Sequence, residues 1–214
     1  MSTIKVDTLN EKSTNGNIAV IPTGSGKLIL DGLTWPHADG SAGQIIKSNG
    51  SAVLSFIDAP SGGFTLGTEQ STGSGTSVTF GSIPTGTTTI VVMFEGVSFT
   101  GDIQTDLTIG DAGGLETSGY VAAAKDIDVG AETTSTAAFI YDDGEGTGAQ
   151  ITGQWTLSLK DAANYTWVAT GVFTSMTAGT FTICSGHKSL SAELTQLQIS
   201  GGTFDAGSIN IMYM

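Results

Sequence analysis

The stretch Gly153-Gln154-Trp155-Thr156-Leu157-Ser158-Leu159-Lys160 decides the class of fold that this chain adopts. Within it, Trp155, Leu157 and Leu159 alternate with polar residues, a pattern that puts the apolar side chains on one face of a β-strand. Residues 207–213, close to the C-terminus, repeat the alternation. A strand that buries one face requires a second layer of structure against it, so further strands are expected.

Strand-like segments recur every 10–15 residues from about residue 76 onward. They cover residues 76–80, 88–97, 106–110, 137–141, 152–160, 165–173, 179–184, 194–200 and 207–213. Many short alternating strands separated by turn residues are typical of a sandwich or a jelly roll. The sequence therefore predicts an all-β protein with a jelly-roll-like β-sandwich knob over residues 76–214.

Two segments of the knob are ambiguous. Residues 121–132 could hold one helical turn around residues 122–125. Leu190, Leu194 and Leu197 have helical spacing, but Thr195 and Ile199 also fit a strand, which we favour because Thr and Gln are frequent there.

The composition of the 214 residues agrees with this fold. Apolar residues make up 39%, enough for a core, whereas only 13% are charged and the helix formers Leu, Glu, Lys and Arg are sparse. Glycine is abundant, with 31 residues, but has no three-residue period, which excludes collagen.

Residues 1–60 form a separate unit of short strand-like pieces, at residues 4–9, 17–21, 27–30, 44–47 and 52–56. The last two flank Ser48-Asn49-Gly50-Ser51, and Asn-Gly between apolar runs predicts a hairpin because both residues accept positive φ. Strands this short and few cannot bury a core alone, so we expect this region to pair with other copies of the chain as an intertwined β stalk, for which three chains are the natural solution. The expected stalk residues are Ile4, Val6, Leu9, Val20, Leu28, Leu30, Trp35, Ile45, Leu54 and Phe56. Residues 61–75 are rich in Gly, Ser and Thr and are interpreted as a neck.

Charge is distributed unevenly. Residues 1–60 carry four Lys and five acids, whereas residues 61–214 carry three Lys and fifteen acids, and the chain has no Arg. Such a surface repels nucleic acid and anionic membranes. It can serve solubility alone, cation binding, or recognition of a polyhydroxylated ligand.

The single cysteine, Cys184, cannot form an intrachain disulfide, which suits assembly in a reducing cytoplasm. No cationic and apolar leader follows Met1, so export by a signal peptide is not expected. The longest apolar run, residues 90–94, is far too short to span a bilayer.

Several motifs resemble those of tail-fibre and virion structural proteins of bacteriophages, especially phages of marine cyanobacteria. In the first 60 residues they are Met1-Ser2-Thr3-Ile4-Lys5-Val6-Asp7-Thr8-Leu9 and Trp35-Pro36-His37-Ala38-Asp39-Gly40-Ser41, the latter followed by Asn-Gly-Ser and Leu-Ser-Phe. In the knob they are Gly110-Asp111-Ala112-Gly113-Gly114-Leu115-Glu116-Thr117-Ser118-Gly119-Tyr120, Thr166-Trp167-Val168, Lys188-Ser189-Leu190-Ser191 and the C-terminal residues 203–213.

This resemblance implies a homotrimeric tail-fibre protein, assembled in the host cytoplasm, that mediates attachment to the host surface through its distal β domain. The implied partners are other copies of the chain, tail or baseplate proteins at the N-terminal segment, and a bacterial surface glycan or outer-membrane component. Nucleic acid is not among the expected partners. A head fibre, a decoration protein, a fibre-to-tail adaptor and, from another class, a capsular-glycan-cleaving enzyme remain alternatives.

Enzymatic chemistry finds little support in the residues, and no cofactor or metal is expected. The chain has no Gly-x-Ser-x-Gly elbow, and Cys184 and His187 on one strand would point to opposite faces. Acid pairs occur at residues 126–128 and 142–145, where they could act on a glycan or bind Ca²⁺, but these segments look like loops. His37 could bind a metal on a threefold axis, although a turn residue facing solvent is the simpler interpretation.

Aromatic residues divide by context. Phe94, Phe139, Trp155 and Phe204 lie in alternating strands and are expected in the core. The tyrosines lie near strand ends beside polar turns, where rings and neighbouring acids suit sugars, although capping the edge of the core is the interpretation we favour for each of them. The candidate receptor-binding residues are Tyr120, Tyr141, Asp142, Asp143, Glu145 and Tyr165.

Overall fold

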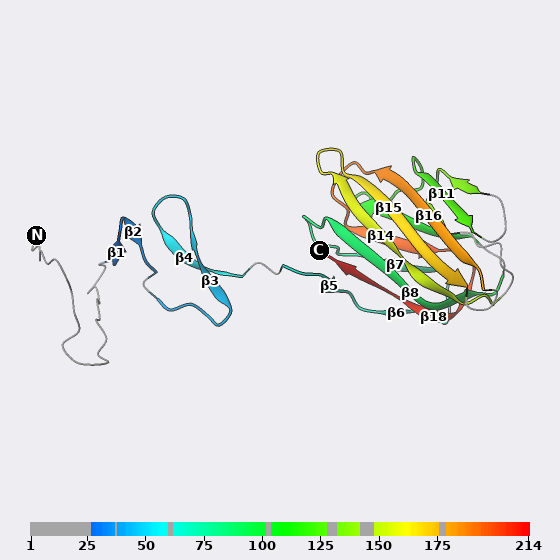
Figure 1. The fold of residues 1–214 in the computed structure, drawn as a ribbon, viewed down its shortest axis with the longest axis horizontal. Helices are drawn as coiled ribbons and strands as arrows, with labels where there is room; N and C mark the ends of the chain where they lie inside the picture. The colour runs from blue at the N-terminus through cyan, green and yellow to red at the C-terminus, as the bar shows by residue number, and fades with distance from the viewer. Residues whose placement is uncertain are drawn as a thin grey trace, which may run out of the picture. The chain divides into compact units, whose positions relative to one another are not determined.

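The computed structural model describes residues 27–36, 38–59, 62–101, 104–127, 132–141, 148–175 and 179–214. All regular secondary structure in these ranges is β-strand, as the ribbon in Figure 1 shows. The chain divides into two compact units, Met1–Ser61 and Gly62–Met214, and each is described by itself. The prediction of an all-β protein is confirmed.

The described part of the first unit consists of two small antiparallel ladders. Strand β1 (Ile29–Leu30) pairs with β2 (Leu33–Thr34), and β3 (Gln44–Ser48) pairs with β4 (Leu54–Asp58). A single parallel bridge between Thr34 and Val53 connects the two ladders. The strands that the sequence predicts at residues 4–9 and 17–21 lie outside the described residues.

The Asn49-Gly50 hairpin forms, but its loop is longer than a two-residue turn. Ser48 pairs with Leu54, so five residues connect the strands, and the residues with positive φ are Gly50 and Ala52 rather than Asn49. The Asn49 side chain explains the longer loop, because its Oδ1 accepts hydrogen bonds from the backbone N–H groups of Ser51 at 2.8 Å and Val53 at 3.2 Å.

The expected stalk residues divide into three groups. Ile4, Val6, Leu9 and Val20 lie outside the described residues. Leu28, Leu54 and Phe56 are half-buried, whereas Leu30, Trp35 and Ile45 are 49%, 37% and 44% exposed in the single chain.

The second unit contains a nine-stranded antiparallel sheet, called here the large sheet. Its order is β12-β11-β16-β15-β14-β8-β18-β5, and β6 also pairs with β18. The bounds are β5 (Thr65–Leu66), β6 (Gln70–Ser71), β8 (Thr89–Phe99), β11 (Val121–Asp126), β12 (Thr133–Ser135), β14 (Ile151–Asp161), β15 (Thr166–Ser175), β16 (Phe181–Ser189) and β18 (Phe204–Tyr213).

A five-stranded antiparallel sheet forms the other layer of the second unit. Its order is β10-β9-β17-β7, with β13 also paired to β9. The bounds are β7 (Ser77–Phe80), β9 (Thr105–Asp111), β10 (Gly114–Leu115), β13 (Phe139–Tyr141) and β17 (Gln196–Ser200).

One continuous apolar core lies between the two sheets and includes side chains from both. Phe94, Phe139, Trp155 and Phe204, which the sequence assigns to the core, are at most 4% exposed. Phe94, Trp155 and Phe173 form a cluster of edge-to-face contacts with ring centroids 4.7–5.4 Å apart. Edge-to-face contacts of this kind add to the free energy gained by burial and fix how the strands pack.

Each strand that the sequence predicts between residues 76 and 214 has a counterpart, and both ambiguous segments are resolved. Residues 121–126 form strand β11, so the helical turn considered there is wrong. Its inward residues Ala122, Ala124 and Asp126 alternate with exposed Val121 and Lys125. The strand interpretation of the last Leu-containing segment is confirmed by β17.

Part of the predicted neck of residues 61–75 belongs to the large sheet, in strands β5 and β6. Strands β5 and β6 pair with β18, and the backbone N–H of Gly67 donates to the carbonyl of Ile211 at 2.7 Å. Thr72 is fully buried, and its hydroxyl donates to the carbonyl of Ala206 at 2.6 Å. The reason is that β18 needs backbone partners on its outer edge, which a polar, glycine-rich segment can supply.

Candidate functional site

The tyrosine expected to bind a receptor at position 120 is a core residue, which corrects that prediction. Tyr120 is 1% exposed, its hydroxyl accepts from the backbone N–H of Ile109 at 2.8 Å, and it donates to the carbonyl of Glu116 at 3.0 Å. Burial raises the pKa of this phenol to about 12. Its ring is therefore part of the core of the sandwich, and it also borders the hollow formed over strands β12, β11, β16, β15 and β14.

The other candidate receptor residues do not form a common site either. Tyr141 is 1% exposed and packs on Phe173 with centroids 4.8 Å apart, which also corrects its assignment as a surface ring. Tyr165 is half-buried in the β14–β15 turn at φ 46°. Asp142, Asp143 and Glu145 lie outside the described residues, as does His37.

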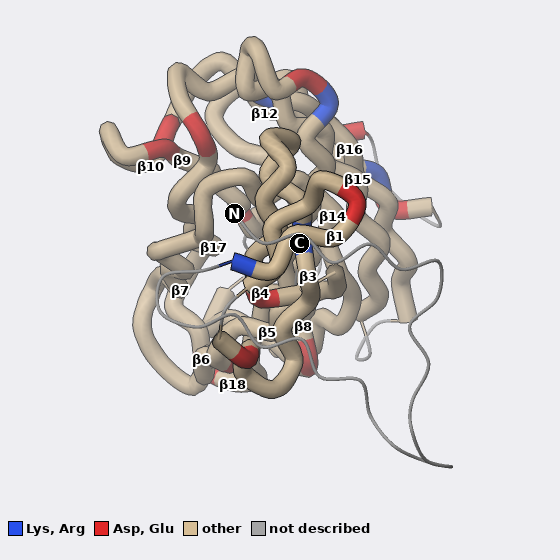
Figure 2. Tube along the Cα trace, turned by 90° about the vertical axis from the view of Figure 1, so that its left-hand side faces the viewer, with Lys and Arg blue, Asp and Glu red and all other residues tan. Residues whose placement is uncertain are grey.

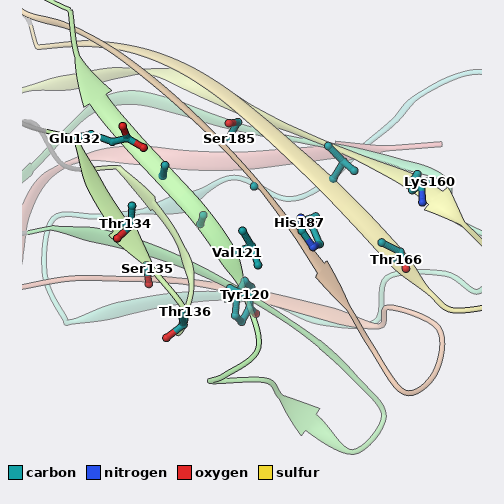
Figure 3. A pocket seen from close by; sticks show the side chains of 14 residues that line it. Tyr120, Val121, Glu132, Thr134, Ser135, Thr136, Lys160, Thr166, Ser185 and His187 are labelled. Carbon is teal, nitrogen blue, oxygen red and sulfur yellow. The ribbon is translucent and has the colours of Figure 1, made fainter.

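The larger hollow of the second unit lies on the outer face of the large sheet instead. It has a volume of about 730 Å³ and spans five adjacent strands, from β12 through β11, β16 and β15 to β14. Figure 3 shows Glu132 and Lys160 at its two ends, with Val121 and His187 between them. This volume lies within the range of about 300–1,000 Å³ that is usual for small-molecule sites.

The strand register explains which side chains line this hollow. Side chains alternate along each strand, so Val168 and His187 are outward neighbours of Val121 across β15, β16 and β11. Two residues further along β11, Ala123 is the cross-strand neighbour of Ser185 on β16 and of Thr134 on β12. The floor is therefore made of small apolar side chains, and the hydroxyl groups of Ser185, Thr134, Ser135, Thr136 and Thr166 surround it.

Charge on this face differs from charge on the rest of the unit. Figure 2 shows acidic residues in many parts of the chain, and residues 62–214 contain fifteen acids against three lysines. Lys188 is buried and paired with Glu116 at 3.5 Å, so Lys125 and Lys160 are the two exposed lysines of these residues. Both lie on the outer face of the large sheet, where the strands β11, β16, β15 and β14 carry a single outward acid, Asp161 at the end of β14.

The carboxylate of Asp161 is hydrogen-bonded to the turn that follows it. Its carboxylate accepts from the Asn164 side chain at 2.8 Å and from the backbone N–H groups of Ala163 at 2.9 Å and Asn164 at 3.3 Å. These hydrogen bonds hold the pKa of this carboxyl below its usual value. Its oxygens are thus turned toward the β14–β15 turn and leave Lys160 as the charged group of the hollow at this end.

Of the residues weighed for catalysis, the fold separates Cys184 from His187. Cys184 points into the core and His187 to the surface on the same strand, which confirms that they lie on opposite faces. Asp126 faces inward at 5% exposure, and its partner in sequence, Asp128, is outside the described residues. Among the described residues, no three His, Cys, Asp or Glu side chains gather as metal ligands. No helix in the described ranges is long and apolar enough to cross a membrane.

Comparisons with known proteins returned no relative. The chain matches no family model, and neither a curated protein nor a solved structure is significantly similar to it. The arguments on function below therefore rest on the geometry and the sequence of this chain.

Of the residues that line the hollow, the sequence analysis named only Tyr120 as a receptor candidate. Alternation within residues 166–174 and 181–189 shows which side chains point outward, and this signal could have suggested Val168, Ser185 and His187. It gives no information on which strands are neighbours. The hollow joins residues 120–123 and 132–136 to residues 160–168 and 185–187, and only strand order brings these segments together.

Proposed function

We propose that this chain is a structural protein of a bacteriophage virion, a homotrimeric tail fibre without enzymatic activity. In this proposal the first unit is the shared β stalk. The second unit is a jelly-roll-like knob whose outer sheet face contacts the surface of a bacterium. The proposal draws on the motif resemblance and on the exposed apolar residues of the first unit.

The exposed apolar residues of the first unit support the assembly of several chains. Six large apolar side chains of the described part of the first unit are 37–60% exposed in the single chain: Ile29, Leu30, Trp35, Ile45, Ile46 and Val53. The two ladders that hold them have strands of two and five residues, too short to enclose a core. Association with other copies removes this apolar surface from water, at about 25 cal/mol for each Å² buried.

The mass of the full-length protein in solution tests the assembly. Three copies of 21.7 kDa correspond to about 65 kDa by light scattering, and a folded monomer would contradict the proposal. The double variant Leu30→Asp and Ile45→Asp should lower the mass toward 21.7 kDa. At each of the two positions the assembled stalk would bring three carboxylates together in an apolar interface, and they would repel one another. Leu66→Asp is the matched control, since Leu66 is 65% exposed but belongs to the second unit.

Attachment and enzymatic activity are tested separately. Labelled full-length protein should bind cells of at least one strain in a panel of marine cyanobacteria, and the monomeric variant should bind much more weakly. Three linked sites gain affinity through effective concentration, which explains this loss. Surface polysaccharide incubated with the protein should release no new reducing ends. Their release would favour a glycan-cleaving enzyme, and localisation by cryo-EM would distinguish a tail fibre from a head fibre, decoration protein or adaptor.

A further inference from the structure

A second, smaller hollow continues the larger one along strands β11 and β16. It has a volume of about 220 Å³ and shares Ala123, Glu132 and Ser185 with the larger hollow. Its far end is lined by Lys125 and Ile183, which are cross-strand neighbours. Together the two hollows form one groove, called here the outer groove, with Lys160 at one end and Lys125 at the other.

The two lysines of the outer groove are too far apart for a single sugar ring to reach both. Lys125 lies in register with Gln154 across three strand spacings, and Lys160 follows Gln154 by six residues along β14. Spacings of about 4.8 Å between strands and 3.3 Å per residue place their Cα atoms roughly 25 Å apart. A ligand that meets both is an extended chain of several units.

The lining of the outer groove favours a carbohydrate over a protein partner. Tightly bound protein segments are usually anchored by Tyr, Trp or Arg in deep pockets, whereas this floor is mostly Ala and Val, with His187 beside them and the buried Tyr120 at its edge. Hydroxyl groups line the groove at Thr134, Ser135, Thr136, Thr166 and Ser185. Hydroxyl groups donate and accept, which matches the alternating needs of sugar hydroxyls.

The placement of charge favours acidic sugars over neutral ones. Both exposed lysines of residues 62–214 lie in this groove, although acids exceed lysines by fifteen to three in that part of the sequence. At physiological ionic strength, salt screens the interaction between charges that lie more than about 8 Å apart. A bound anion therefore interacts more strongly with the nearby ammonium groups than with most acids elsewhere. Glu132, at the β12 side of the groove, is the one acid among the lining residues. Its carboxylate can accept hydrogen bonds from sugar hydroxyls.

We propose that the outer groove binds an extended acidic glycan, whose carboxylate or other anionic groups meet Lys160 and Lys125 while its hydroxyls bind the Ser and Thr side chains between them. This inference rests on the proposed attachment function, because it names the class of surface molecule that the knob would contact.

Titration calorimetry of the full-length protein with oligogalacturonate, a linear acidic probe, and with maltooligosaccharide of the same length tests the ligand class. Oligogalacturonate should bind at least fivefold more tightly. Lys160→Gln and Lys125→Gln should each weaken its binding by about three- to tenfold, the range expected for loss of one partly exposed charge-assisted hydrogen bond. Lys47→Gln, an exposed lysine of the first unit, should leave it unchanged. Equal affinity for both probes, or indifference to the two groove lysines, would overturn the inference.

A steric pair of variants separates the groove from the rest of the sheet face. Ser185→Tyr places a ring between the two hollows at an exposed position and should abolish binding of oligogalacturonate. Gln154→Tyr, exposed and outward on β14 but outside the groove, should not. If Ser185→Tyr instead changes the mass in solution and oligogalacturonate never binds, the groove is a contact between copies and the inference is wrong.

A cell-binding assay distinguishes failure of this inference from failure of the proposed attachment function. Wild-type protein that binds cells, with Ser185→Tyr unable to do so, supports both. Cell binding that survives Ser185→Tyr keeps the attachment function but overturns the groove as its site. Oligogalacturonate binding without any cell binding keeps the groove and its ligand class but overturns attachment.

Discussion

The indole N–H of Trp155 donates a hydrogen bond to the sulfur of Cys184 at 3.0 Å, across an intervening strand. Register explains the contact, since Trp155 pairs with Gly171 and Gly171 pairs with Cys184. The glycine has no side chain, so the indole reaches over β15 to the thiol beneath the outer groove. Three residues distant in the sequence thus form one layer of the core.

The Cys184 thiol should be unreactive in the native protein. It is 7% exposed, and burial raises its pKa to about 12, although the Trp155 hydrogen bond acts in the opposite direction. Because the thiolate is the nucleophile, iodoacetamide at pH 8 should leave Cys184 unmodified, and alkylation should become complete in denaturant. Mass spectrometry measures the difference. Fast stoichiometric labelling without denaturant would show that the strand pairing described here is wrong.

Gly171→Ala should destabilise the second unit strongly. A methyl group at this position would lie 2.5 Å from the Cys184 sulfur and 2.6 Å from Cδ1 of Trp155, closer than van der Waals contact allows. Overpacking of this kind costs about 1–3 kcal/mol of unfolding free energy, which urea denaturation followed by Trp fluorescence can measure.

Gly81→Ala is the control for this substitution, since Gly81 has no heavy atom within 4 Å of the added carbon and no positive φ. Its unfolding midpoint should stay close to that of the wild type. Equal midpoints for both variants would contradict the packing around Trp155.

Tyr120→Phe should reduce stability because the hydroxyl satisfies buried backbone groups. Without it the N–H of Ile109 in β9 loses its partner, which costs about 1–3 kcal/mol for a buried donor. Urea denaturation measures the loss, and the half-buried Tyr165→Phe is the matched control. A Tyr120→Phe protein as stable as the wild type would mean that Tyr120 faces solvent and would reopen its assignment to a receptor site.

Asp111 should make stability depend on pH in the acidic range. Its carboxylate accepts from the Ser191 hydroxyl at 2.6 Å and from the N–H of Gly113 at 2.8 Å, and these bonds hold its pKa below the usual value. A lowered folded pKa contributes stability that is fully present above the unfolded pKa of about 3.9 and is lost as pH falls through the folded pKa.

Unfolding free energies of wild type and Asp111→Asn, measured by urea from pH 7 to pH 2, test this. The difference in unfolding free energy between wild type and Asp111→Asn should be constant between pH 7 and 5. It should become smaller below about pH 4, because the wild-type carboxyl is protonated there. Ser191→Ala should show the same trend with a smaller difference, since the backbone donors of Gly113, Ser191 and Ala192 remain. A difference that grows toward low pH would contradict the hydrogen bonding of Asp111.

The sequence by itself determined that this protein is all-β. Alternation in residues 153–160 and 207–213, together with frequent turn residues, is a local property of the chain that any pairing of strands must satisfy. The same alternation placed Trp155 in the core and separated Cys184 from His187, because side chains of a strand point alternately to its two faces.

Only the tertiary structure decided which faces are covered and which strands adjoin. Tyr120 and Tyr141 are receptor candidates in sequence, yet both are buried. Tyr141 lies on β13, which pairs with β9 in the smaller sheet and brings its ring against Phe173, and Tyr120 packs edge-to-face on Phe139 of the same strand. The outer groove depends in the same way on β11, β16, β15 and β14 being neighbours. Backbone hydrogen bonds between strands are alike for every sequence, so strand order is set by packing across the whole core and cannot be inferred from a local pattern.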